Sequence, residues 1–241
     1  MRYAGVKVVL LVVLCAVSVA VKAAPSQSPG CVILLHGLAR TANAMDPMAK
    51  ALAQAGYQTV NMDYPSTKAN IETLAESVIP QALSQCQHIE PVHFVTHSMG
   101  GILVRQYLSA NHISGLGRVV MLAPPNKGSE IVDAMRDFTL YQWIYGPAGQ
   151  QLGTDKASVP NTLGPVQFEL GVIAGNYSIN LLTSWLLPLP HDGKVSVAST
   201  RVEGMQSHLV LPVSHTFIMN NHEVIAQTMT FLRQGRFIDN H

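Results

Sequence analysis

Short apolar runs alternate with helical patterns along most of this chain. Short, mostly apolar runs predict strands at residues 31–35, 92–95, 119–123, 170–174 and 208–213, and residues 57–62 are a further strand candidate. Helical spacing of apolar positions predicts helices at 44–55, 71–83, 100–108 and 222–232. Pro80 should kink or shorten the second of these helices. Because the strands are apolar on both faces, we predict an α/β fold, a mostly parallel sheet with helices on both sides.

Two segments interrupt the alternation of strands and helices. Residues 126–167 begin with a helical pattern and continue with aromatic residues, Gly and Pro, whereas residues 177–191 form a shorter apolar stretch. Both segments follow strand ends, and functional sites in parallel sheets lie at the carboxyl ends of the strands. Long insertions in a compact domain are often functional, so we expect these two to form a cap or lid.

The first residues have the layout of a secretory signal peptide. Arg2 and Lys7 precede an unbroken apolar run over residues 8–21, and Ala23 provides a small residue for cleavage. The apolar run has 14 residues, whereas about 20 are needed to span a bilayer, although an uncleaved membrane anchor remains the alternative. We therefore predict a signal peptide at residues 1–23, an exported protein that is periplasmic or secreted, and a single domain at residues 24–241.

Composition supports one well-buried domain and argues against some partners. The chain has 241 residues, of which 48% are hydrophobic and only 12% charged. Loss of Arg2, Lys7 and Lys22 with the signal peptide changes the formal charge from +1 to −2. Since no basic run remains, we expect no nucleic acid partner.

A lone serine stands between a predicted strand and a predicted helix. Residues 96–100 read Thr-His-Ser-Met-Gly, close to the G-x-S-x-G pattern of a nucleophile elbow but with Thr96 at the first position. In such an elbow the tight turn projects the hydroxyl above the sheet. A helix-capping serine is the alternative, but the flanking strand and helix favour Ser98 as a nucleophile.

A serine nucleophile needs a base, and the base needs an acid that orients it. His215 follows the carboxyl end of the last predicted strand, whereas His208 opens that strand at the opposite edge. Among the seven carboxylates between Ser98 and His215, Asp192 lies in a loop after the strand at 170–174. We predict His215 as the base and Asp192 as the acid, with Glu203 as the next candidate.

Backbone amides near the serine should stabilise negative charge on a substrate oxygen. Gly37 allows a turn after the first strand, so that the Leu38 amide faces Ser98 and forms an oxyanion hole with the Met99 amide. We expect His36, Gly37 and His97 to line the substrate site. No H-E-x-x-H motif or cysteine pair with ligand spacing is present in the sequence, so we predict no metal and no other cofactor.

Together these motifs resemble those of a known superfamily. The stretches VILLHGLAR, VHFVTHSMGGILVRQYL, VVMLAPPNKGSEI, GVIAGNYSIN, DGKVSVAST and LPVSHTFIMNN look like a bacterial secreted α/β-hydrolase of the lipase/esterase type, similar to small triacylglycerol lipases. The resemblance extends from about Cys31 to Phe237. It implies an α/β-hydrolase fold, with Ser98, His215 and Asp192 as catalytic triad and the Leu38 and Met99 amides as oxyanion hole.

We therefore predict a serine hydrolase that cleaves carboxylic esters through an acyl-enzyme. An acyltransferase or thioesterase with the same triad is the first alternative, and a non-catalytic binding protein on a hydrolase fold is the second. The partner is expected to be a small-molecule or lipid ester, with transient contact to a lipid surface as an option. The sequence does not decide the acyl chain length, the alcohol or the oligomeric state.

Two further hypotheses build on this fold. Cys31 starts one predicted strand and Cys86 lies just before another, and these two strands are neighbours in an α/β-hydrolase. The two cysteines are therefore candidates for a disulfide in an exported protein, with two free thiols as the alternative. The apolar segment 177–191, which includes Trp185, should form a wall for an acyl chain together with part of residues 141–145. A plain core-packing loop is the alternative for that segment.

Overall fold

The fold is built on a single parallel sheet. The computed structural model describes residue 1 and residues 29–179 and 184–238, so the predicted signal peptide lies, apart from Met1, outside the described residues. Six strands form the sheet in the order β2-β1-β3-β4-β5-β6, and all of their pairings are parallel. Their bounds are β1 Cys31–Leu35, β2 Gln58–Met62, β3 Val92–His97, β4 Leu116–Leu122, β5 Leu170–Gly175 and β6 Ser207–Leu211.

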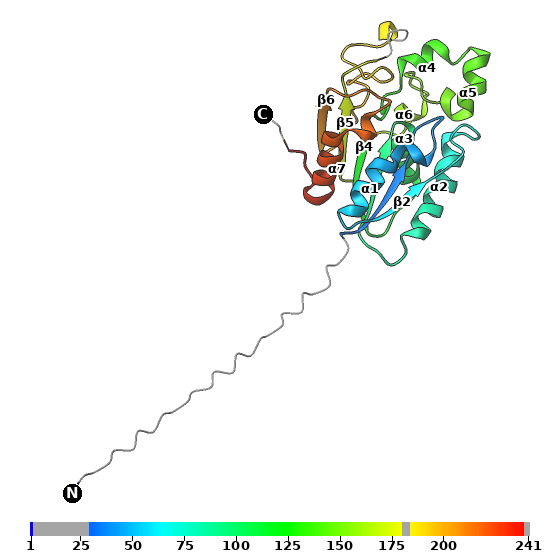
Figure 1. Ribbon diagram of the computed structural model, residues 1–241. Coiled ribbons are helices and arrows are strands. Elements are labelled where there is room, and N and C mark those ends of the chain that lie inside the picture. Colours follow the sequence, from blue (N-terminus) through cyan, green and yellow to red (C-terminus); the bar gives the residue numbers. More distant parts are fainter. Residues whose placement is uncertain (2–28, 180–183, 239–241) are drawn as a thin grey trace.

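Helices cover both faces of this sheet (Figure 1). The bounds of the long helices are α1 Asp46–Gln54, α2 Ile71–Gln85, α3 Met99–Ala110 and α7 His222–Gln234. Helices α2 and α3 pack on one face and α1 and α7 on the other. The predicted α/β architecture is therefore confirmed.

The alternation of side chains along β1 explains the two layers. Cys31, Ile33 and Leu35 are fully buried among residues of α2 and α3, whereas Val32 and Leu34 are fully buried among residues of α1 and α7. A strand with two buried faces reads as a continuous apolar run. This is why the pattern Cys-Val-Ile-Leu-Leu already predicted a central strand.

The predicted shortening of helix α2 at Pro80 is not found. The helix neither stops nor shortens there, but continues for five more residues to Gln85. Pro80 lies on the exposed side of the helix, where water can satisfy the carbonyl that loses its helical donor. A proline inside a helix is tolerated more easily at such a position.

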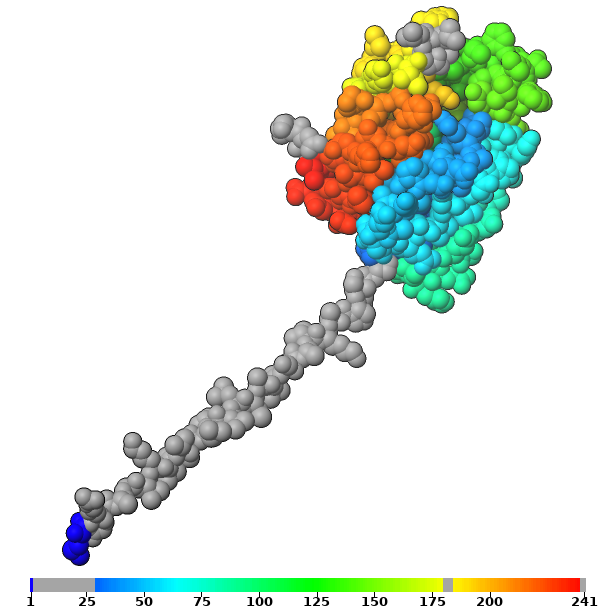
Figure 2. All heavy atoms as spheres, viewed as in Figure 1, coloured from blue at the N-terminus to red at the C-terminus, as the bar shows by residue number. Residues whose placement is uncertain are grey.

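The two predicted insertions extend the carboxyl end of the sheet. The first contains α4 Glu130–Met135, α5 Thr139–Gln150 and α6 Val159–Thr162, and the second contains the short 3₁₀ helix η2 Ser184–Leu186. Figure 1 shows α4 and α5 together at one end of the molecule, and Figure 2 shows that residues of both insertions occupy this end. Among the described residues, no helix is long and apolar enough to cross a membrane.

Arg105 of α3 holds the first insertion at both of its ends. Its buried guanidinium donates through one nitrogen to the carbonyl and side-chain oxygens of Asn126, at 3.0 and 3.2 Å, and through the other to the carbonyl of Gly164 at 2.9 Å. Asn126 in turn donates to the carbonyl of Thr200 at 2.8 Å. Charge-assisted hydrogen bonds of this kind are stronger than neutral ones, so the two ends are firmly anchored.

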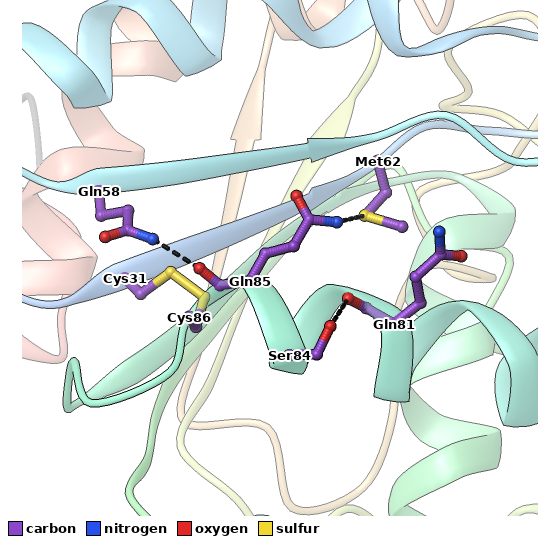
Figure 3. The surroundings of a disulfide bond; sticks show 7 residues. All are labelled: Cys31, Gln58, Met62, Gln81, Ser84, Gln85 and Cys86. Atoms are coloured by element: carbon purple, nitrogen blue, oxygen red, sulfur yellow. Dashed lines mark hydrogen bonds between the residues drawn. A yellow bond between two sulfur atoms is a disulfide. The ribbon is translucent and has the colours of Figure 1, made fainter.

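A disulfide joins Cys31 to Cys86 at the opposite edge of the sheet, as hypothesised from the sequence (Figure 3). The two Cα atoms are 5.8 Å apart, and the bridge connects the start of β1 with the end of α2. Beside it, the side chain of Gln58 donates to the carbonyl of Gln85 at 2.7 Å. Both contacts fix the last turn of α2 against the sheet.

Candidate active site

Ser98 occupies a tight turn between β3 and α3. Its backbone angles are φ 52° and ψ −123°, a region that residues with side chains rarely adopt. The turn is held because the amide of Ser98 donates to the carbonyl of Leu122 on β4, at 2.8 Å. Such a strained strand-to-helix turn has the geometry of a nucleophile elbow, and the role of Ser98 as nucleophile stays a prediction.

Glycines after the serine allow the helix to start close to the sheet. A Cβ atom at Gly100 would lie only 2.7 Å from the carbonyl oxygen of Leu35 and 2.9 Å from that of His36. A Cβ atom at Gly101 would lie 3.2 Å from the side-chain oxygen of Thr96. The missing side chain of Gly101 therefore leaves room for both Met121 and Thr96, which pack closely against the start of the helix.

Three side chains from different strand ends form a chain of hydrogen bonds. The Nε2 atom of His215 lies 3.1 Å from the Oγ atom of Ser98, and its Nδ1 atom lies 2.7 Å from the Oδ2 atom of Asp192. Both His215 and Asp192 are buried. In the tautomer that fits these contacts, His215 donates from Nδ1 to Asp192 and accepts from the Ser98 hydroxyl at Nε2.

The Asp192 carboxylate is held at both oxygens. Its Oδ1 atom accepts from the backbone amides of Lys194 at 2.9 Å and Val195 at 2.8 Å, which leaves Oδ2 for His215. Its backbone carbonyl accepts from the amide of His215 at 3.0 Å. The acid and the imidazole are thus joined by a side-chain and a main-chain hydrogen bond, which fixes the orientation of the ring.

His97 supports His215 from beneath. The Nε2 atom of His97 donates to the carbonyl of His215 at 3.1 Å, and the two rings lie 4.8 Å apart. The pKa of His97 lies well below its ordinary value because burial removes its hydration and because His215 repels a second charge. His97 is therefore a neutral group that positions the carbonyl of His215.

The loop after β1 is fixed by His36. Its Nδ1 atom donates to the carbonyl of Gly37 at 2.8 Å, its ring stacks on Tyr64 at 4.0 Å, and the Tyr64 hydroxyl donates to the carbonyl of His36 at 2.5 Å. Burial lowers the pKa of His36, so its ring is neutral. His36 is fully buried and does not line the cavity, so it positions the loop instead of contacting a substrate as expected.

Gly37 is needed for a different reason from the one predicted. Its φ is not in the left-handed region, but a Cβ atom there would lie 2.9 Å from His97 Nδ1 and 3.1 Å from the Cβ atom of Ser98. Close approach, and not the turn, therefore requires glycine.

Leu38, which follows Gly37, lines the cavity. Met99 begins α3, where the first backbone amides have no partner within the helix. Their role as an oxyanion hole remains a prediction.

A cavity of about 200 Å³ opens beside Ser98 and His215. Its apolar wall comes mainly from the first insertion, with contributions from Ile131, Val132, Met135, Tyr141, Tyr145 and Leu152. Trp185 was expected in this wall, but it is 79% exposed and does not line the cavity. Leu181 and Leu182 of the same segment lie outside the described residues. Hence the predicted wall is found at Tyr141 and Tyr145, and not at Trp185.

Two charged residues of the cavity were not predicted from the sequence. Arg40 and Lys194 line it together with Ser98 and His215. Their distance from the motifs could have indicated them in the sequence, because Arg40 lies three residues after Gly37 and Lys194 lies two residues after Asp192.

No group of three or more His, Cys, Asp or Glu side chains forms a metal site within residues 29–179 and 184–238.

A parallel sheet that presents a serine elbow, a histidine and a carboxylate at its carboxyl edge defines an α/β-hydrolase. The chain belongs to the alpha/beta hydrolase family, whose model matches residues 32–225. No curated protein is similar enough in sequence to count as a relative.

Solved structures with the same fold carry names of lipolytic enzymes. The mature lipase BlEst2 of Bacillus licheniformis is 18% identical with a TM-score of 0.64, over 87% of this chain and 94% of that one. Phospholipase PlaB of Legionella pneumophila is 19% identical with a TM-score of 0.61, over 85% of this chain and 57% of that one. The metagenomic carboxyl esterase MGS0156 is 17% identical with a TM-score of 0.66, over 80% of this chain and 66% of that one. At these identities the likeness concerns the fold.

Proposed function

We propose that this protein hydrolyses carboxylic esters through an acyl-enzyme, with Ser98 as nucleophile, His215 as base and Asp192 as the orienting acid. One observation carries the proposal: Ser98 Oγ, His215 and Asp192 form a continuous hydrogen-bonded chain, at 3.1 and 2.7 Å, beside a cavity with a mainly apolar lining. Membership of the alpha/beta hydrolase family and the names of the structural neighbours support it.

The reaction follows from the contacts of these three residues. His215 Nε2 takes the proton of Ser98 as Oγ attacks the carbonyl carbon, and Asp192 stabilises the resulting imidazolium. The amides of Leu38 and Met99 are proposed to donate to the oxyanion. His215 then gives the proton to the leaving alcohol. A water molecule, deprotonated by the same histidine, attacks the acyl-enzyme and releases the acid.

The decisive variant is Ser98→Ala. It should lower kcat for p-nitrophenyl butyrate by about 10⁴-fold or more and abolish labelling by a fluorophosphonate, while circular dichroism stays unchanged. Ser109→Ala is the matched control, because Ser109 lies in an exposed position at the other end of α3. If Ser98→Ala kept most of the activity, or if the label attached to another residue, the proposal would be wrong.

The apolar lining of the cavity supports a preference for medium acyl chains over acetate. The wall from residues 131–152 buries apolar surface against a chain, and each buried methylene contributes up to about 0.8 kcal/mol. A series of p-nitrophenyl esters from acetate to decanoate should therefore show kcat/KM rising with chain length until the cavity is filled. A flat profile would contradict this part of the proposal.

We propose also that the protein works in an oxidising compartment outside the cytoplasm. The Cys31–Cys86 disulfide supports this, because such bonds persist mainly in exported proteins. Fractionation of the native host should recover the mature protein in the periplasm or medium, with its first residues removed. Recovery in the cytoplasm with both thiols reduced would contradict it.

A further inference from the structure

The cavity beside Ser98 is apolar on one side and cationic on the other. The apolar side comes from α4, α5 and residues close to them, whereas Arg40 follows β1 and Lys194 belongs to the loop of the proposed acid. A cavity that held only a neutral ester would gain little from two cations. Their presence therefore suggests that the ligand carries negative charge.

Neither cation has an ion-pair partner among the described residues. The ion pairs formed by arginine in that part of the chain are Arg118 with Glu169 and Arg136 with Asp155, and both lie outside the cavity. No salt bridge joins Arg40 or Lys194 to a carboxylate within residues 29–179 and 184–238. Two like charges at one cavity repel each other, and both attract an anion that enters it.

Lys194 is firmly tied to the catalytic loop. Its amide donates to the Asp192 carboxylate at 2.9 Å, and its carbonyl accepts from the hydroxyl of Ser129 at 2.8 Å. Lys194 lines the cavity but remains exposed to solvent. The pKa of its ammonium lies below its ordinary value, because nearby protein displaces part of its water and because Arg40 repels it, whereas Asp192 acts in the opposite direction. An anion bound between the two cations would relieve this repulsion.

We propose that Arg40 and Lys194 form an anion site in the substrate cavity, so that the preferred substrate is an amphiphilic ester with an apolar acyl chain and a fixed negative charge close to the scissile bond. This inference rests on the proposed ester hydrolysis for its substrate, but the anion site itself does not depend on turnover. The charge can belong to a phosphate on the alcohol part or to a carboxylate on the acyl part.

Three matched esters separate these sources. Monooctanoylglycerol is neutral, monooctanoylglycerol phosphate carries the charge on the alcohol part, and the glycerol monoester of octanedioic acid carries it on the acyl part. We expect kcat/KM for one of the two anionic esters to exceed that of the neutral ester about tenfold or more. Added NaCl should reduce this preference, since salt screens charges at a partly open site.

Variants then assign the preference to the two residues. Arg40→Gln and Lys194→Gln should each lower the ratio of anionic to neutral kcat/KM by about threefold to tenfold. The matched control is Lys50→Gln, which removes an exposed cation of α1 far from the cavity and should leave the ratio unchanged. An equal loss for all three esters would show that the cations serve the triad, and would overturn the proposal, as would a wild-type enzyme without a preference.

Binding gives a readout that is independent of hydrolysis. By titration calorimetry, octyl phosphate should bind the Ser98→Ala variant at least tenfold more tightly than the neutral ether 1-O-octylglycerol, and addition of Arg40→Gln should remove most of the difference. Equal binding of the two amphiphiles would refute the anion site. If octyl phosphate binds as expected but wild type cleaves no ester, the anion site stands and the proposed function fails.

Discussion

Replacing both cysteines of the Cys31–Cys86 bridge by alanine should lower stability strongly without affecting the proposed active site. The bridge closes a loop with a sequence separation of 55 residues, for which the chain-entropy relation gives about 4 kcal/mol of unfolding free energy at 25 °C. For a domain of this size each kcal/mol corresponds to roughly 2–4 °C. The double variant should therefore melt roughly 10 °C below the oxidised wild type.

The position of the bridge explains why activity should survive. Cys31 begins β1, whereas Gly37 and Ser98 lie beyond the carboxyl ends of β1 and β3. At about 3.3 Å per residue, the length of β1 alone separates them by roughly 15 Å. Ester turnover at 20 °C, well below the melting temperature, should thus stay within about twofold of wild type.

Thermal denaturation followed by circular dichroism, with and without reductant, measures the effect. Reductant should destabilise the wild type but not the double variant, which provides the internal control. Intact mass after alkylation of native, unreduced protein should show no modified thiol at Cys31 or Cys86. Alkylation of both, or a double variant that melts together with oxidised wild type, would refute the reasoning.

Three further predictions concern single residues. Asp192→Asn should lower kcat by about 10⁴-fold in the ester assay. The amides of Lys194 and Val195 would hold the amide oxygen of Asn and turn its NH₂ towards His215, which would then have the wrong tautomer. Near-wild-type activity would place the acid elsewhere, with Glu203 tested next. Gly37→Ala should lower kcat about tenfold to a hundredfold with an unchanged circular dichroism spectrum, because its Cβ would press on His97 and on Ser98 and displace them. Unchanged kinetics would contradict this. Burial lowers the pKa of His208 from 6.5 to about 4, so on acidification the unfolded chain takes up a proton first, and stability present above pH 6.5 is lost as the pH falls towards 4. The melting temperature of His208→Asn should therefore depend less on pH in this window than that of wild type. The same dependence of melting temperature on pH in both proteins would refute the assignment.

The sequence predicted the proposed triad because each member follows a strand. Ser98, Asp192 and His215 come after β3, β5 and β6, and the carboxyl ends of parallel strands meet at one edge. The expectation of a parallel sheet thus brought three distant residues to one edge, although the choice of Asp192 over Glu203 stayed open in the sequence. The continuous apolar runs predicted the sheet for the same reason, since a central strand needs apolar residues on both faces.

Residues in loops could not be placed in this way. Trp185 lies in the apolar segment 177–191 and was expected in the cavity wall, yet it is exposed and does not line the cavity. Periodicity gives no direction for a side chain in an irregular segment. Similarly, nothing local distinguished Arg40 and Lys194 from ordinary surface cations, because their meeting depends on how two separate loops fold over Ser98.

Because Arg105 holds both ends of the first insertion, the insertion can be exchanged as one unit. Since one guanidinium holds both Asn126 and Gly164, the segment between them can change in length and sequence while its two ends keep the same positions on the sheet. Most of the apolar wall of the cavity lies within this segment. Evolution, or a protein engineer, could therefore exchange the proposed acyl-binding wall as one unit between positions 126 and 164 and leave the serine turn and the disulfide unchanged, provided that Ser129 is kept, because its hydroxyl donates to the carbonyl of Lys194 beside Asp192.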